Sequence, residues 1–330
     1  MERNIKIERY KPGREKEVLK LLQGSGRRFQ LADIPVAAGE IKQEDFEKFV
    51  LGHKDFKPED VFLAISKDEL LGIMCIRKEE NKGLVPVLVI KNHYLERVGP
   101  FLLRKAEESL LQVDRVIIGV GVGLIPLISW IREKEERNLV QFLLSQGYRK
   151  SHDIRLHMAL EVKNFKTPDN LEKLEEQCNR KGIHFRPCLN ENELENVFQK
   201  FDLRRGYVEE LRIQKRLDLI HLAFLKNRII GYCSYLGRSL GRNELVFGPI
   251  EVAEELRGKG IGTVLLVKSL QDVIKKESAP RIVLSTHRER VRFYSQVGFE
   301  IISKHTLMEK SFMTIETRKQ WKFIKKSVLP

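Results

Sequence analysis

The stretch that most constrains the fold is a strand-like run that leads into a turn with three glycines and the start of a helix. The run ends in Gly248-Pro249-Ile250-Glu251-Val252, and Arg257-Gly258-Lys259-Gly260-Ile261-Gly262-Thr263 follows after a short acidic turn. Glycine leaves the backbone uncovered, so successive N–H groups can point into one concavity, and a helix start adds partial positive charge. Residues 257–263, called the glycine turn below, therefore predict a pyrophosphate site, to which Arg257 and Lys259 add full charges.

Other glycine-rich turns fit this segment less well. A Walker loop needs G-x-x-x-x-G-K-[ST], which the chain lacks. A dinucleotide fingerprint needs G-x-G-x-x-G after the first strand of a parallel βαβ unit, whereas here the spacing differs and the strand lies in mid-domain. A helix start with incidental glycines remains, but glycine inside a helix costs up to about 1 kcal/mol relative to alanine. Three glycines within five positions therefore favour a ligand.

The surroundings of the glycine turn predict a mixed sheet with helices on it. An apolar stripe with a 3.6-residue period predicts a helix over 260–276. Thr286 and Glu289 fit a capping box for a helix that ends near 296. The other expected elements are helices over 191–201 and 208–217, a hairpin of strands 221–226 and 229–236 with its turn at Asn227-Arg228, and strands over 244–252, 281–285 and 299–308.

The N-terminal half repeats this order, which indicates a duplication. It has a hairpin over 61–66 and 70–77, a strand over 84–90, a helix expected to begin at Gly99, and strands over 115–120 and 148–162, the last two separated by a helix over 133–146. We expect a first domain over 1–163, a linker over 164–182, a second domain over 183–310, and a basic tail or helix over 311–330 around Trp321 and Phe323.

Composition narrows the class of protein. The 330 residues carry 60 Lys+Arg against 46 Asp+Glu, and the formal charge of +14 favours anionic partners. The four cysteines show no C-x-x-C pair and no zinc-like spacing, so we expect free thiols, no metal and a cytoplasmic location. The charged start argues against a secretory signal, and the apolar run 116–131 is too short and too broken by glycine and proline to span a bilayer.

The glycine turn resembles the acyl-CoA signature [RQ]-x-x-G-x-[GA] of the GNAT superfamily of N-acetyltransferases. Arg257, Gly260 and Gly262 fill its three defining positions, and Val252 stands where that family has the valine that ends the strand. Phe293-Tyr294-x-x-x-Gly298-Phe299 resembles a second landmark of the family. The resemblance implies two GNAT-like α/β (mixed α+β) domains in tandem, each a mostly antiparallel mixed sheet flanked by helices. The first is a degenerate copy, because Glu96, Phe101 and Leu143 replace the expected basic residue, glycine and tyrosine.

The resemblance also implies a cofactor, acetyl-CoA, with CoA as the product, and roles for particular residues. The backbone amides of Arg257, Gly258, Lys259, Gly260, Ile261, Gly262 and Thr263 would hold the pyrophosphate, and the pantetheine arm would pair with the strand near Ile250 and Val252. The Val252 amide would stabilise the oxyanion. Tyr294 would protonate the leaving thiolate, or alternatively only pack the helix on the sheet. Glu251 and Glu244 are candidates for the general base, and His287 replaces an Asn that often contacts the CoA arm.

The expected reaction is therefore transfer of an acetyl group to a primary amine of a small molecule, peptide or protein, with the site in the C-terminal domain. Two alternatives stay open. A regulatory module that binds CoA or a nucleotide would keep the glycine turn without needing Tyr294. A nucleic-acid-binding protein would use the basic charge and the tail over 311–330, although the chain shows no recognised nucleic-acid motif.

Overall fold

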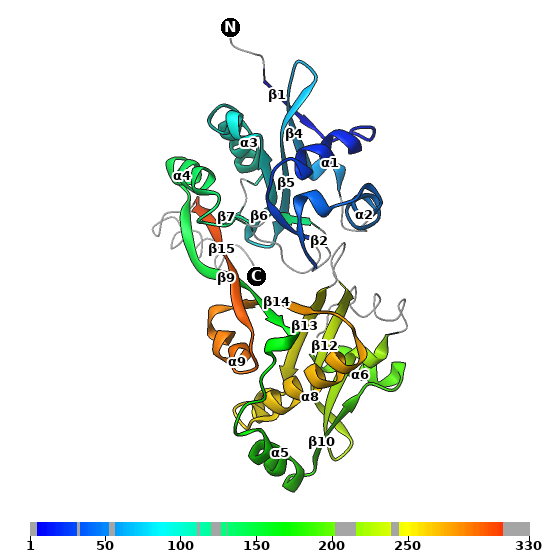
Figure 1. Ribbon diagram of the computed structural model, residues 1–330. Coiled ribbons are helices and arrows are strands. Elements are labelled where there is room, and N and C mark those ends of the chain that lie inside the picture. The colour runs from blue at the N-terminus through cyan, green and yellow to red at the C-terminus, as the bar shows by residue number, and fades with distance from the viewer. Residues whose placement is uncertain are drawn as a thin grey trace, which may run out of the picture. The chain divides into compact units, whose positions relative to one another are not determined.

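The structure, a computed structural model, describes residues 5–31, 34–52, 57–110, 113–119, 127–129, 131–201, 216–238 and 244–312. The chain forms two compact units. Unit 1 comprises Met1–Ile154 together with residues from His305 onward, and unit 2 comprises Arg155–Lys304. Each unit is a mixed, mostly antiparallel sheet flanked by helices, which confirms the expected fold class (Figure 1).

The main sheet of unit 1 has the strand order β1-β4-β5-β6-β7-β15, with β6 and β7 parallel and the other pairs antiparallel. A small second sheet has the order β3-β2-β8. The strands are β1 (Lys6–Arg9), β2 (Arg28–Leu31), β3 (Ile34–Ala37), β4 (Val61–Ser66), β5 (Glu69–Glu79), β6 (Lys82–Ile90), β7 (Arg115–Ile118), β8 (Leu127–Ser129) and the end of β15 (Glu300–Ser311). The helices are α1 (Glu15–Gln23), α2 (Gln43–Phe46), α3 (Leu95–Ser109) and α4 (Arg137–Ser145), and a π-helical turn over Glu47–Leu51 follows α2.

Unit 2 has the strand order β9-β14-β13-β12-β11-β10, in which only β13 and β14 are parallel. Its strands are the end of β9 (Arg149–Glu161), β10 (Ile183–Pro187), β11 (Ile220–Leu225), β12 (Arg228–Arg238), β13 (Glu244–Val252) and β14 (Arg281–His287), and the first residues of β15 also belong to it. Its helices are α5 (Leu171–Arg180), α6 (Glu191–Phe201), α8 (Ile261–Lys276) and α9 (Val291–Ser295).

The last strand of each unit comes from the other half of the sequence. In unit 1 the strand beside β7 is the end of β15, where Met308 pairs with Ile118. In unit 2 the strand beside β14 is the end of β9, where Leu160 pairs with Ile282. The expected boundaries, 1–163 and 183–310, assign these two strands the other way. The expected linker 164–182 contains α5, which packs against α8 within unit 2.

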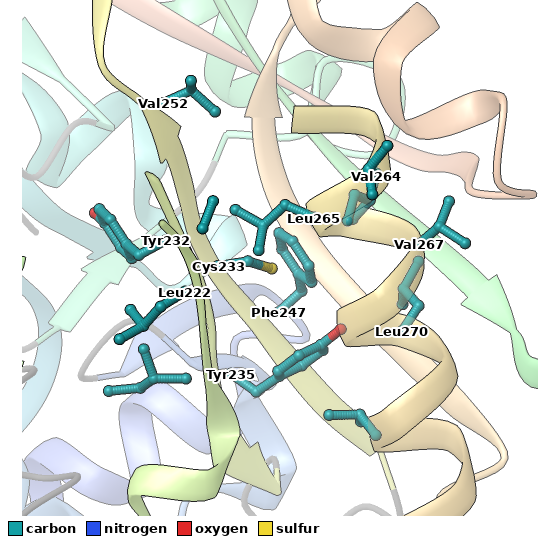
Figure 2. Close-up of a cluster of buried hydrophobic side chains, with 14 of the residues drawn as sticks. Leu222, Tyr232, Cys233, Tyr235, Phe247, Val252, Val264, Leu265, Val267 and Leu270 are labelled. Atoms are coloured by element: carbon teal, nitrogen blue, oxygen red, sulfur yellow. The ribbon is translucent and has the colours of Figure 1, made fainter. Parts of the chain in front are cut away.

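The core of unit 2 lies between its sheet and α8 (Figure 2). Val264, Leu265 and Leu270 of α8 are fully buried, and Phe247 and Tyr235 come from the strands below them. Each such apolar side chain stabilises the fold by about 1.5–3 kcal/mol when it leaves water. The helix expected over 260–276 is confirmed as α8, and its apolar stripe is the reason that it lies flat on the sheet.

Several expected elements differ in detail. The hairpin turn of unit 2 lies at Lys226-Asn227, both with positive φ, one residue before the expected position. The capping box is wrong, because Thr286 lies inside β14, so its hydroxyl does not begin a helix. The helix expected to begin at Gly99 begins at Leu95, and Gly99 lies inside it. The ranges 208–217, apart from its last two residues, and 313–330 of the expected tail lie outside the described residues.

Candidate functional site

A bulge in β13 prepares the candidate site. Cys233 of β12 pairs with Ile250 and Tyr235 pairs with Phe247, so β13 has one more residue than β12 over this interval. Pro249 lies in the extra length, and its carbonyl accepts a hydrogen bond of 3.1 Å from the Ser234 hydroxyl. Proline has no N–H to give to a ladder, which is why it is tolerated at a bulge.

The neighbouring strand leaves β13 close to this bulge. The parallel ladder between β13 and β14 consists of three pairs and ends at Val246 and Val283. Beyond this point β14 continues to His287 and pairs on its other side with β9. The segment 247–252 of β13 therefore keeps backbone groups on its β14 side that this ladder does not use, and an extended molecule can pair with them.

The glycine turn presents a row of unused N–H groups. Gly258 and Gly260 have φ of 76° and 81°, a region that favours glycine, and Gly260 is the N-cap of α8. Within the described part of the chain, none of the six backbone N–H groups from Gly258 to Thr263 donates to a protein acceptor. Six adjacent donors at the start of a sixteen-residue helix make a binding place for an anion.

The charged side chains of the glycine turn, Arg257 and Lys259, bond to protein groups close to the turn. The Arg257 guanidinium donates to the Val252 carbonyl at 3.0 Å and pairs with the Glu251 carboxylate at 3.1 Å. The Lys259 ammonium donates to the Glu255 carbonyl at 2.9 Å. Arg257 thereby ties the end of β13 to the turn that follows it, and the bare donors are backbone amides.

The two αL glycines of the turn have different surroundings. A Cβ at Gly260 would lie 2.6 Å from a Leu174 methyl group of α5, whereas a Cβ at Gly258 would meet nothing within 4 Å. Gly260 therefore allows α5 to pack closely, and Gly258 faces open space. Thr263, the last residue of the turn, accepts a hydrogen bond from the Gln296 side chain at 3.4 Å.

Tyr294 lies on α9 and is buried, with 4% of its surface exposed. Its ring makes edge contacts with Phe247 of β13 and with Phe299, at centroid distances of 5.8 and 5.9 Å. Burial raises the pKa of Tyr294 to about 12, and Arg290 acts in the opposite direction. A hydroxyl with this pKa keeps its proton at neutral pH and can donate it. The contact with Phe247 places Tyr294 beside the part of β13 that contains the bulge.

The candidate bases lie apart from each other. Glu251 is half-exposed and pairs with Arg257. Glu244, at the first residue of β13, is buried and pairs with Arg281 at 3.0 Å. Seven residues along a strand correspond to roughly 23 Å, so the two carboxylates cannot serve one reacting atom. His287 ends β14 and precedes the 3₁₀ turn that leads to α9.

Sequence reasoning missed a buried polar cluster beneath α8. The Ser269 hydroxyl lies 3.0 Å from the Cys233 sulfur and accepts a hydrogen bond from Tyr235 at 3.3 Å. Nearby, His221 of β11 bonds to Asp272 of α8 at 2.8 Å. Ser269 and Asp272 are three residues apart on one helix, and this spacing in an otherwise apolar stripe was the available signal.

The C-terminal half of the chain is similar to one known protein family. Residues 186–314 match the family model of the acetyltransferase (GNAT) domain. No curated protein matches the chain. Among the described residues, no helix is long and apolar enough to cross a membrane, and no group of three or more His, Cys, Asp or Glu side chains is arranged to hold a metal ion.

Solved structures match the chain over 94% of its length. One is the GCN5-related glucosamine N-acetyltransferase region of a fungal multi-domain GH3 β-N-acetylglucosaminidase, with a TM-score of 0.70 and 16% identity; the match covers 38% of that chain. A GCN5-related N-acetyltransferase from Sphaerobacter thermophilus has a TM-score of 0.64, 15% identity and 96% coverage. A tandem GNAT protein from the clavulanic acid biosynthesis pathway has a TM-score of 0.60, 13% identity and 99% coverage. These likenesses show the fold of the chain, and the family-model match is confined to residues 186–314.

Proposed function

We propose that unit 2 transfers an acetyl group from acetyl-CoA to a primary amine by direct attack. The observation that carries the proposal is the row of bare amides from Gly258 to Thr263 at the end of a strand whose ladder to β14 is short. The amides would hold the pyrophosphate, and the pantetheine arm would pair with the segment 247–252 as an added strand. Both features are needed for one extended cofactor whose pantetheine arm is joined to a diphosphate.

The thioester would lie toward the bulge, near Gly248 to Ile250, because Tyr294 packs against Phe247. The neutral amine attacks the carbonyl carbon; the C–N bond forms and the C–S bond breaks. Tyr294 gives its proton to the leaving thiolate and regains one from solvent. A backbone N–H of the bulge region would stabilise the oxyanion, so Val252, the residue expected for this role, would hold the arm instead.

The attacking amine must lose its protons to a base, and Glu251 and Glu244 remain the candidates. Their separation along β13 means that at most one of them acts directly. The acceptor is proposed only as a primary amine. A module that binds CoA without chemistry would share the glycine turn, and measurement of thiol release from acetyl-CoA across a panel of amines distinguishes the two.

The glycine turn can be tested with a matched pair of variants. Gly258→Asp adds a carboxylate to the anion site without a clash, since a Cβ there meets nothing within 4 Å. Gly182→Asp is the control, because Gly182 also has a positive φ, 72°, and open surroundings in unit 2. Calorimetric titration with acetyl-CoA should show one site per chain, an affinity loss of at least about tenfold for Gly258→Asp, and no change for Gly182→Asp. Equal affinities in the two variants would remove the basis of the proposed function.

A further inference from the structure

Ser234 of β12 lies opposite the bulge of β13, and none of its surface is exposed. The side chains before and after it, Cys233 and Tyr235, point toward α8, where both bond to Ser269 (Figure 2). Because successive side chains of a strand point to opposite faces, Ser234 lies on the other face of the sheet. Its hydroxyl donates to the Pro249 carbonyl at 3.1 Å. The bulge therefore has an anchor from a side chain of the neighbouring strand.

This hydrogen bond fixes the direction of the amide that follows the proline. A trans peptide group is planar, and its C=O and N–H point in opposite directions. The Pro249 carbonyl points toward β12, so the Ile250 N–H of the same peptide group points away from β12, toward the side of β14. Alternation along the strand gives the same direction, because the Ala253 N–H donates to the Ile230 carbonyl of β12 at 2.8 Å and Ile250 lies three residues earlier.

The side that the Ile250 N–H faces is the one at which β14 leaves β13. The ladder between these two strands ends at Val246 and Val283, four residues before Ile250. Tyr294 lies beside the same part of β13, because its ring contacts Phe247 at a centroid distance of 5.8 Å. The Ile250 N–H and the proposed acid therefore border the same stretch of the strand.

The bulge of unit 1 lacks this anchor. It lies between the partners of Cys75 and Arg77 on β5, so Ile76 takes the place of Ser234 and Pro86 that of the bulge proline. The Ile76 side chain is buried and has no hydrogen-bond donor. A bulge at this place therefore forms without a hydroxyl, and the hydroxyl of unit 2 is available to orient the peptide group within it.

We propose that Ser234 is a positioning residue for the acyl transfer: its hydroxyl holds the Pro249 carbonyl so that the Ile250 N–H stays directed at the oxygen of the thioester carbonyl. This inference rests on the transfer proposed for unit 2, and it names the donor for the oxyanion. Negative charge develops on that oxygen as the amine attacks, and a donor that is already oriented needs no reorganisation at that moment. Without the hydroxyl, the peptide group can turn, and the donor is oriented only part of the time.

Kinetics of serine variants of the full chain test this role. With an amine that the wild type accepts, Ser234→Ala should lower the turnover of thiol release from acetyl-CoA about tenfold to a hundredfold, less than the loss of a whole oxyanion donor, because the amide itself remains. The KM for acetyl-CoA should change less than about twofold. Ser234→Thr keeps the hydroxyl and should recover most of the turnover. Ser269→Ala is the control, because Ser269 is also fully buried in unit 2 but donates to the Leu266 carbonyl, at 2.9 Å, on the α8 face.

Circular dichroism checks that each variant is folded. If Ser234→Ala does not fold, Ser234→Cys gives the same test, because a thiol fills the space and is only a weak donor. A wild type that releases no thiol with any amine contradicts the proposed function, and the inference fails with it. An active wild type whose turnover is unchanged in the folded alanine or cysteine variant, or is lowered equally in Ser269→Ala, overturns the inference alone.

A second measurement needs no turnover. In the full chain with isotope-labelled isoleucine, the amide signal of Ile250 is identified by its loss in Ile250→Val, and the protein is titrated with acetyl-CoA and with CoA. The Ile250 amide proton should shift further downfield with acetyl-CoA, because only acetyl-CoA brings a thioester carbonyl to accept its hydrogen bond. This difference should decrease in Ser234→Ala. An Ile250 signal that responds equally to the two ligands in the wild type would show that another group faces the carbonyl, and the inference would be wrong.

Discussion

The same path of strand, bulge and helix occurs in both units, and it differs where the helix begins. In unit 1 the parallel ladder of β6 ends at Val85, directly before Pro86 and the bulge in the pairing with β5. In unit 2 the ladder of β13 ends at Val246, just before the bulge around Pro249. The duplication expected from the sequence therefore extends to the position of the proline bulge.

The turns that follow these strands are unlike. In unit 2 the six amides from Gly258 to Thr263, before and within the first turn of α8, have no acceptor among the residues that the structure describes. In unit 1 a 3₁₀ turn over Asn92–Tyr94 leads directly into α3, and the Leu95 amide bonds back to the Asn92 carbonyl. Gly99, which the sequence suggested as the equivalent glycine, is inside α3, where a Cβ would lie 2.3 Å from the Phe142 ring. Its role is close packing of α3 and α4.

The edge of β6 next to the bulge is a further difference between the units, because in unit 1 one of its backbone groups has a side-chain partner. The buried Arg27 guanidinium donates to the Leu88 carbonyl of β6 and pairs with Glu136. A backbone group next to the bulge thus has a partner from within the unit. The bulge is therefore a feature of the sheet in both copies, whereas the anion site depends on the turn that follows the bulge.

The largest predicted effect concerns Tyr294, whose position Leu143 takes in unit 1. Tyr294→Phe should lower turnover by about 10²–10⁴, the usual contribution of a general acid, and change acetyl-CoA affinity less than about twofold. Steady-state kinetics and calorimetry measure the two quantities. Tyr148→Phe is the control in unit 1, where the hydroxyl bonds to Glu107 at 3.3 Å, and it should leave turnover unchanged. Unchanged turnover in Tyr294→Phe would leave this ring a packing role only.

The next effect concerns stability and the number of cofactor sites. Arg27→Ala leaves Glu136 buried without its cation and should destabilise unit 1 by about 3 kcal/mol, measured by urea unfolding. The double variant Arg27→Met/Glu136→Leu should recover most of this loss, because removal of both charges leaves neither unpaired. The double variant should still bind one acetyl-CoA per chain. If the double variant bound two acetyl-CoA molecules per chain, Arg27 alone would keep the cofactor out of unit 1. The glycine turn would then not be the decisive difference between the units.

Much of this arrangement could be predicted from the sequence, because it follows from local patterns. The glycine turn, the α8 stripe and the hairpin of strands 61–66 and 70–77 depend on residues close together in the chain, and the structure has all three. The resemblance to the GNAT domain, which the family-model match over residues 186–314 supports, was recognisable for the same reason, since its two landmarks lie within one continuous segment. Local glycine chemistry and apolar periodicity specify such elements without tertiary information.

What the sequence did not show depends on distant residues. The exchange of the last strands between the halves is set by which edges β9 and β15 pair with, and strand pairing at this separation has no local signal. The packing role of Gly99 requires knowledge that Phe142 lies against it. Likewise, the ion pairs of Glu244 and Arg257 cannot be read from spacing alone. Candidate roles for charged residues are therefore the part that needs the structure.

The smallest predicted effect is a difference between the two units in how stability depends on pH. His221 pairs in register with Cys233, and Val61 takes the same place opposite Cys75 in unit 1. Burial lowers the pKa of His221 below its ordinary 6.5, although Asp272 acts in the opposite direction. Well above pH 6.5 the imidazole is neutral in both states and the stability is full. As pH falls below 6.5, the unfolded chain takes up the proton first, so the stability of unit 2 decreases until the folded pKa is passed.

His221→Val installs the residue of unit 1 and should remove this decrease, with a change well below that of Arg27→Ala. The measurement is the urea midpoint of the wild type and the variant at pH 7.5 and pH 5.5, from which the difference in pH dependence is taken. His184→Val, at an exposed position on β10, should leave the decrease unchanged. A decrease of equal size in His221→Val would show that the acid sensitivity lies elsewhere, and the buried histidine would then not distinguish unit 2 from unit 1.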